Sequence, residues 1–186
     1  MNRLRLLMLP ALILVSALTI FAKTKEEKQA EARKKADQVL ARLYKAKPSA
    51  QNAIKAAAGY AVFSNAGMKI LVAGGGKGRG IAVDNVTQKV VYMKMREVQA
   101  GFGMGVKKFS TIFVFEKKEK LEEFTNSGWE FGGQTSAAAK TSDGGGSIEG
   151  AVAVSPGVWM YQLTDKGIAL ELTGKGTKYS KNDELN

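Results

Sequence analysis

The chain has 186 residues, enough for one domain of ordinary size with a single core. It contains no histidine and no cysteine, which excludes Ser-His-Asp and Cys-His nucleophilic sites, structural zinc sites and disulfides. The formal net charge of +11 favours association with phosphate-bearing surfaces but does not choose between lipid and nucleic acid.

The N-terminus has the pattern of an export signal. Arg3 and Arg5 precede an uncharged, mostly apolar run over residues 6–22. Cleavage is expected after Ala17 or Ala22, with Ala22 favoured because the polar chain begins next. Loss of residues 1–22 would remove two cations and no acid, lowering the charge from +11 to +9. We therefore expect an exported, periplasmic protein that associates peripherally with the membrane. An uncleaved anchor in the inner membrane is the alternative, because the run is only slightly shorter than a membrane span.

Residues 23–48 are predicted to form a basic amphipathic helix. Its apolar stripe consists of Ala32, Ala36, Val39, Leu40, Leu43 and Tyr44. The stripe can dock on the domain while the charges stay solvated, or it can contact a membrane. It has no Trp or Phe, so any intrinsic insertion should be weak. Pro48 ends this helix, and Ser49 is a candidate cap for a second, short one.

The rest of the chain is typical of antiparallel sheet, with β-branched and aromatic runs between glycines and polar turns. One helix is expected over residues 117–124. Strands are expected over residues 60–63, 68–73, 80–83, 89–95, 99–106, 111–115, 129–131, 135–140, 147–154, 158–163 and 168–172, with a hairpin turn at 165–167. The predicted fold class is α+β, with a curled antiparallel β-sheet or barrel-like core, and residues 175–186 are expected to be a polar C-terminal tail.

The glycine-rich run at residues 74–80 resembles a phosphate loop but fails in detail. A P-loop needs glycine where Leu71 stands and Ser or Thr where Gly78 stands. The third glycine of a dinucleotide fingerprint would fall on Arg79. We therefore expect these glycines to serve packing or bending. An anion-binding loop at Lys77 and Arg79 is the alternative.

Several blocks, taken in order, resemble the SYLF domain. They are GYAVF at 59–63, GGGKGRGIAV at 74–83, residues 99–106, the strand and helix at 109–124, residues 135–139, residues 151–154 and GVWMYQLTDKG at 157–167. The resemblance spans residues 50–173, so the domain is set at 49–174. It implies a lipid-binding domain without known enzymatic activity, in a family whose eukaryotic members bind phosphoinositides and actin filaments. It also implies that the basic N-terminal helix contacts membrane.

The resulting prediction is a non-enzymatic protein that binds anionic phospholipid headgroups, with no cofactor and no metal. The candidate anion-binding residues are Arg33, Lys34, Lys35, Arg42, Lys77, Arg79, Lys107 and Lys108. A second hypothesis is an envelope structural module with a protein partner, in which the charge serves solubility. Nucleic-acid binding is not expected, because export argues against it and no array of stacked aromatic and basic residues is visible.

Overall fold

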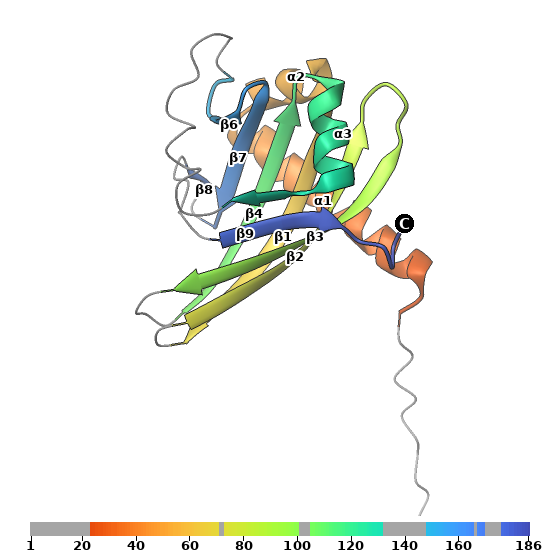
Figure 1. The fold of residues 1–186 in the computed structure, drawn as a ribbon. Coiled ribbons are helices and arrows are strands. Elements are labelled where there is room, and N and C mark those ends of the chain that lie inside the picture. The colour runs from red at the N-terminus through yellow and green to blue at the C-terminus, as the bar shows by residue number, and fades with distance from the viewer. Residues whose placement is uncertain (1–22, 71–72, 101–104, 132–147, 166, 170–175) are drawn as a thin grey trace, which may run out of the picture.

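The computed structural model describes residues 23–70, 73–100, 105–131, 148–165, 167–169 and 176–186. The predicted export signal at 1–22 and the strand expected at 135–140 lie outside these ranges. The described residues form three helices and one sheet (Figure 1). The elements are α1 (Lys25–Ala46), α2 (Ser49–Ala56), β1 (Gly59–Ile70), β2 (Ala73–Asp84), β3 (Val90–Ala100), β4 (Gly105–Phe115), α3 (Lys118–Ser127), β5 (Trp129–Phe131), β6 (Val152–Ser155), β7 (Val158–Thr164), β8 (Gly167–Ala169) and β9 (Gly176–Lys181).

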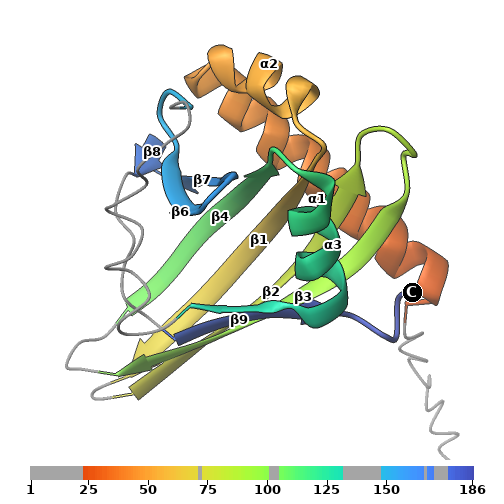
Figure 2. The same ribbon diagram turned by 45° about the horizontal axis from the view of Figure 1, so that its top comes forward.

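The sheet is antiparallel throughout its described pairs and strongly curled. Its strand order is β5-β9-β3-β2-β1-β4-β7-β6, with β8 paired to β7. Helices α1 and α2 cover one face, and α3 lies on the other (Figure 2). The predicted α+β class with a curled antiparallel sheet is confirmed.

Helix α1 begins at a capping box. The Thr24 hydroxyl accepts a hydrogen bond from the Glu27 amide at 3.2 Å, and the Glu27 carboxylate accepts one from the Thr24 amide at 2.9 Å. The buried stripe of α1 consists of Ala32, Ala36, Val39, Leu40 and Leu43. Of the two alternatives for this stripe, the structure shows docking on the domain. In α2, the residue at the N-cap is Pro48, and Ser49 instead donates to Glu149 at 3.2 Å, so the expected Ser49 cap is wrong.

The sheet separates two hydrophobic cores. The first lies between the sheet and α1 and α2, where Val62, Ile112 and Tyr161 meet the α1 stripe. The second lies under α3 and is rich in aromatic rings: the ring centroids of Phe63 and Tyr179 are 4.7 Å apart, and Phe124 contacts the same group. Both cores occupy the end of the sheet nearest α2 and α3, and they leave the far ends of β1 to β4 without a helix on top (Figure 1).

The strand boundaries differ from the expected ones because glycine does not interrupt the long hairpins. Segments 60–63 and 68–73 belong largely to one strand, β1, and residues 74–80 lie within β2. The glycine run is therefore part of the sheet and forms no loop. Its packing role is confirmed at Gly78 and Gly80, where a Cβ would collide with Asn65 and with the Val62 carbonyl. Of the strand expected at 99–106, residues 99–100 belong to β3 and residues 105–106 to β4, while residues 101–104 lie outside the described residues.

The segment expected to be a polar tail contains strand β9. This strand pairs with β3 on one side and β5 on the other. Tyr179 from β9 is buried in the aromatic core, and Leu185 is buried beneath α1. The sequence of β9 (GTKYSK) carries one large apolar side chain, which explains why its pattern resembled a tail.

Over the part of the chain that the structure describes, none of the helices combines the length and the apolar character that a membrane crossing requires.

Candidate functional site

A groove of about 640 Å³ opens between α1 and the far ends of the central strands. It has the volume of a small-molecule site. Its lining is dominated by cations: Lys28, Lys35, Arg42, Lys77, Arg79, Lys94, Arg96 and Lys108, against the acids Glu31, Asp165 and Glu184. The excess of positive charge makes the groove attractive to anions.

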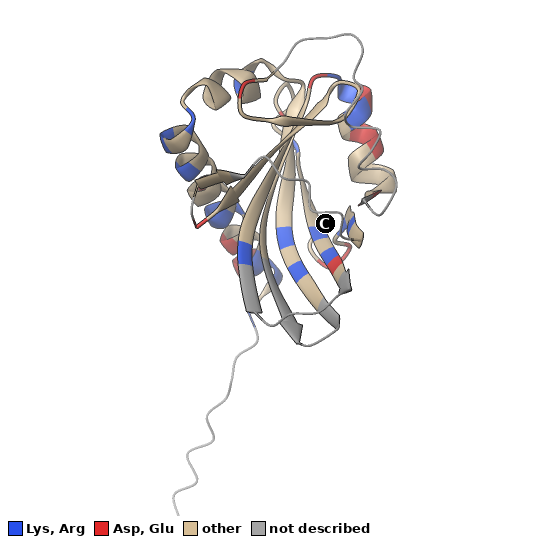
Figure 3. Ribbon diagram, turned by 90° about the vertical axis from the view of Figure 1, so that its left-hand side faces the viewer, with Lys and Arg blue, Asp and Glu red and all other residues tan. Residues whose placement is uncertain are grey.

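The strand register places the sheet cations in two adjacent rows. Arg79 on β2 is the register partner of Lys94 on β3. Two residues further along, Lys77 is the partner of Arg96, and Lys108 on β4 is the partner of Ala66, which pairs with Lys77. Residues two apart on a strand share a face, so these cations lie on the face that α1 covers. Figure 3 shows Lys and Arg positions side by side at one level of neighbouring strands.

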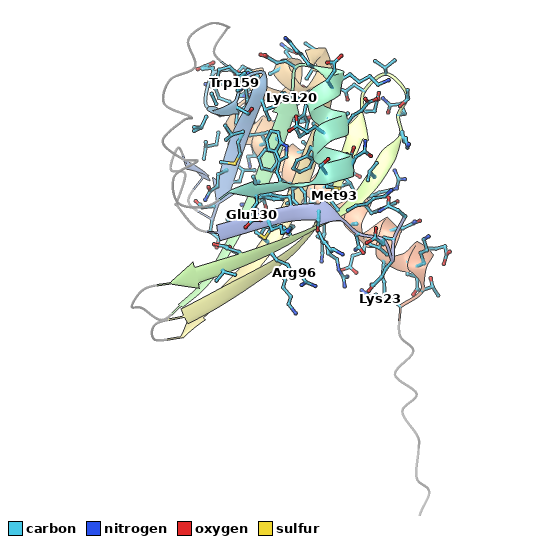
Figure 4. All side chains as sticks on the ribbon, viewed as in Figure 1. Lys23, Met93, Arg96, Lys120, Glu130 and Trp159 are labelled. Atoms are coloured by element: carbon cyan, nitrogen blue, oxygen red, sulfur yellow. The ribbon has the colours of Figure 1, made fainter. Side chains whose placement is uncertain are left out.

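Four of these sheet cations have no acidic partner in the part of the chain that the structure describes. Among the described residues, no carboxylate oxygen lies within 4.0 Å of the charged groups of Lys77, Arg79, Arg96 or Lys108. All four side chains are exposed, and Figure 4 shows Arg96 projecting from the ribbon. Lys94 differs, because its amine lies 3.9 Å from the Asp183 carboxylate. Among the described cations that β2, β3 and β4 contribute to the groove, these four are therefore the ones without a carboxylate within that distance.

The α1 wall of the groove is partly neutralised. Glu31 accepts hydrogen bonds from Lys23 at 2.9 Å and forms an ion pair with Lys35 at 2.8 Å. The hydrogen bonds from these two amines, with their charges, lower the pKa of Glu31 to about 2. This carboxylate therefore stays charged at neutral pH and holds two lysines on the helix.

The structure brings five of the predicted site residues together. Lys35, Arg42, Lys77, Arg79 and Lys108 all line the groove. Arg42 also donates to the Thr164 carbonyl at 3.1 Å, which ties the helix to the end of β7.

The other three predicted residues do not join this group. Arg33 donates from Nε to the Tyr92 hydroxyl at 2.7 Å, and its guanidinium lies 5.4 Å from the centre of that ring, so it links α1 to β3. Lys34 is exposed and does not line the groove. Lys107 pairs with Gly67 through the backbone of β4, and its side chain lies outside the described part.

Sequence reasoning missed three cations of the groove. Lys28 precedes Lys35 and Arg42 at steps of seven residues, two helical turns, which places all three on one face of α1. Lys94 and Arg96 are two apart, as residues on one face of a strand are. That second signal was hidden because residues 89–95 and 99–106 were assigned to separate strands, which left Arg96 between them.

The described lining of the groove offers concentrated positive charge. Its side chains include no histidine or cysteine, since the chain has none. Lysine and arginine bind phosphate groups through charge and, for arginine, through paired hydrogen bonds. The geometry therefore suits binding of a phosphate-bearing partner.

Two comparisons show which known proteins this chain is similar to. A family model for Ysc84, described as "Las17-binding protein actin regulator", matches residues 96–186. Beta cell expansion factor A of Aeromonas veronii is 32% identical over 157 residues, which cover 84% of this chain and 58% of that relative. The chain thus spans somewhat more than half the length of the relative. The resemblance to the SYLF domain is confirmed: residues 96–186 match the model of the Ysc84 (SYLF) family, which is known in general for binding actin and lipid.

Proposed function

We propose that this protein binds anionic phospholipid headgroups at a membrane surface, without catalysing a reaction. The observation that supports this most is a group of four exposed cations on one face of the sheet, where β1 lies between β2 and β4: Arg96 on β3, Lys77 and Arg79 on β2, and Lys108 on β4. None has a described carboxylate within 4.0 Å. A lipid phosphate layer would supply the missing negative charge.

Electrostatic repulsion between the cations of this face is a second argument. Like charges directly opposite each other on neighbouring strands destabilise a sheet. Here Lys77 faces Arg96, and Arg96 also faces Lys178 of β9. Of these three, Lys178 is the one with a described acid nearby, since its amine lies 3.8 Å from the Glu130 carboxylate. An anionic partner would remove this repulsion, so the face gains stability when it is occupied.

The expected affinity is modest and depends on salt. A basic residue near an anionic bilayer contributes about 1 kcal/mol, and four such residues give an upper limit of about 4 kcal/mol. Exposed charges are screened within about 8 Å at physiological ionic strength. The export predicted from residues 1–22 forms part of the proposal, because it would bring the groove to the periplasmic surface of a membrane.

Vesicle co-sedimentation of the protein from Lys23 onward tests this function. We expect binding that rises with the fraction of acidic lipid and falls as salt rises from about 50 to about 300 mM, a change that shortens the Debye length by a factor of about 2.4. Neutral phosphatidylcholine vesicles should retain little protein. Equal binding to neutral and acidic vesicles, or no binding to either at low salt, would contradict the proposal.

A further inference from the structure

The floor of the groove begins with a row of polar side chains directly beyond the hydrophobic core. On the face that α1 covers, Val62 and Ile112 are register partners buried in the core. Two residues further along the strands, the register row holds Ser64 on β1, Arg79 on β2 and Ser110 on β4. Residues two apart on a strand share a face, and all three of these residues line the groove. Two hydroxyls and a guanidinium therefore border the groove where the core ends.

Ser110 is buried, and its hydroxyl has no hydrogen-bond partner among the described residues. The residue is 4% exposed. Over the described part of the chain, no hydrogen bond involves the hydroxyl of Ser110 or that of Ser64. A buried hydroxyl is normally hydrogen-bonded, because leaving water without a replacement partner costs free energy. The two serines therefore offer hydrogen-bonding capacity to whatever enters the groove.

Arg79 brings positive charge to the same row. Its side chain is exposed, and no described carboxylate oxygen lies within 4.0 Å of its guanidinium. A guanidinium presents five N–H donors in a planar fork that matches the oxygens of a phosphate group. Because Arg79 is the register partner of Ser64, the row combines one charged donor group with two neutral donors on three adjacent strands.

The spacing of this row suits a single phosphate group. Ser64 lies between Arg79 and Ser110 and is the direct register partner of both. The Cβ atoms of such partners are about 4.5–5.5 Å apart, and a hydroxyl donates to an oxygen at about 2.7 Å. Two hydroxyls at this separation can therefore donate to different oxygens of one phosphate. The longer side chain of Arg79 can reach another oxygen of the same group.

The groove has room for more than the phosphate itself. Its volume of about 640 Å³ exceeds what one phosphate group needs, so the group esterified to the phosphate fits as well. On the α1 side, Ala32 lines the groove with a single methyl group, and Lys35, which also lines it, is held by Glu31 at 2.8 Å. The helix therefore adds positive charge above the row and leaves space below it.

We propose that Ser64, Arg79 and Ser110 form a subsite that binds one phosphate group of a phosphate ester. This inference rests on the proposed function and adds a recognition element to it. The exposed cations attract any anionic surface, whereas the two hydroxyls bind only a group that enters beneath α1. The phosphate can belong to a lipid headgroup or to a free phosphate ester, and the two sources are separated by experiment.

A double variant, Ser64→Ala with Ser110→Ala, removes both hydroxyls and leaves the net charge unchanged. Its matched control is Ser127→Ala with Ser180→Ala, since neither residue lines the groove. Affinity for phosphatidylglycerol vesicles should fall about tenfold in the first variant, because hydrogen bonds to a charged group are lost, and should hardly change in the control. Equal affinities of the two double variants would overturn the proposal.

Thermal unfolding of the same variants separates a binding role from a structural one. The Ser64 and Ser110 hydroxyls have no described protein partner to lose, so the groove variant should melt at or slightly above the wild-type temperature. A clearly lower melting temperature would assign the hydroxyls to the fold and would also overturn the proposal.

Glycerol 3-phosphate identifies the source of the phosphate. At millimolar concentration it should shift the backbone amide NMR signals of Ser64, Arg79 and Ser110 in the wild type, with much smaller shifts in the groove variant. Competition with phosphatidylglycerol vesicles would show that the subsite takes the lipid phosphate. Shifts without competition would assign the subsite to free phosphate esters. Absence of shifts at these amides in the wild type, together with unaltered vesicle binding in the groove variant, would show that there is no such subsite.

Failure of the subsite and failure of the proposed function give different results. If the wild type and the groove variant bind acidic vesicles equally, the subsite alone is wrong. If the wild type binds no acidic vesicles at low salt, the proposed function is wrong, and the titration with glycerol 3-phosphate then decides the subsite by itself.

Discussion

Lys77 on β2 and Arg96 on β3 are direct register partners on one face of the sheet, with no described carboxylate within 4.0 Å of either charge. Two cations in this position repel each other. The repulsion weakens the free protein and, in our account, is relieved when an anionic surface contacts the groove. Stability and binding should therefore respond in opposite directions to the loss of either charge.

Lys77→Gln tests this opposition. Removing one of two facing like charges should raise the free energy of unfolding by a few tenths of a kcal/mol, up to about 1. Affinity for acidic vesicles should fall about fivefold, the equivalent of about 1 kcal/mol. Chemical denaturation and vesicle titration measure the two effects. Lys34→Gln, which removes one exposed charge outside the groove, is the control and should change affinity less. Parallel loss of stability and binding in Lys77→Gln would be evidence against the account.

Glu31→Gln should strengthen binding. The substitution releases Lys23 and Lys35 from their carboxylate partner and removes one negative charge from the groove wall. We expect tighter binding to acidic vesicles at low salt, with the difference disappearing at high salt. Glu26→Gln changes the charge equally at an exposed position outside the groove lining. A Glu31→Gln affinity at or below that of Glu26→Gln would count against the mapped groove.

The same glutamate gives a prediction about pH. Its folded-state pKa of about 2 lies below the ordinary value of 4.5, so its ion pairs stabilise the fold at pH values above 4.5. This contribution should decline as pH falls from 4.5 toward 2 and be absent below that. The difference in unfolding free energy between the wild type and Glu31→Gln, measured across this range, should shrink accordingly. A difference that stays constant down to pH 2 would contradict the assigned ion pairs.

Arg33→Gln should affect the fold more than the function. This substitution removes the hydrogen bond to Tyr92 and the contact with its ring. We expect a loss of about 1–2 kcal/mol in unfolding free energy, the usual scale for one hydrogen bond and one cation–π contact. Affinity for acidic vesicles should decrease no more than in Lys34→Gln. A larger decrease would show that Arg33 takes part in anion binding, as the sequence predicted.

Gly80→Ala should be strongly destabilising, because a Cβ there meets the Val62 carbonyl and the Phe63 ring. Overpacking of this kind costs about 1–3 kcal/mol. Gly75→Ala is the matched control on the same strand, where the nearest atom to a new Cβ is the Glu97 carbonyl oxygen at 3.5 Å. That variant should be neutral or slightly stabilised. Thermal unfolding compares the two, and equal melting temperatures would show that the glycines of β2 do not serve packing.

The fold class, α1, α3 and β5 could be predicted from the sequence because their patterns are local. The stripe of α1 repeats at helical spacing, and the aromatic run of β5 stands between a helix and a polar segment. The long hairpins could not be delimited, because Gly78 and Gly80 interrupt the apolar alternation although they continue the strand. The place of β9 depends on pairing with β3, from Met93 with Lys181 to Val98 with Gly176, and no local pattern contains so distant a partner.

The candidate site was predictable in part for the same reason. Lys77 and Arg79 could be selected because they stand together in a glycine run, and Lys35 and Arg42 because they lie on a basic helix. Arg96 and Lys94 become part of the groove only through the register of β2 with β3. Arg33 does not line the groove, because its side chain binds Tyr92, which lies 59 residues away in the sequence.

The most direct test of the central claim is a comparison of two variants with equal charge. In one, Lys77, Arg79, Arg96 and Lys108 are all changed to Gln. In the other, four exposed lysines outside the groove, Lys34, Lys45, Lys55 and Lys117, are changed to Gln. Binding to acidic vesicles at low salt is then measured for both. Our account predicts that the first variant loses nearly all binding and the second retains most of it. Equal losses in the two variants would show that net charge, and not the groove, attracts the membrane.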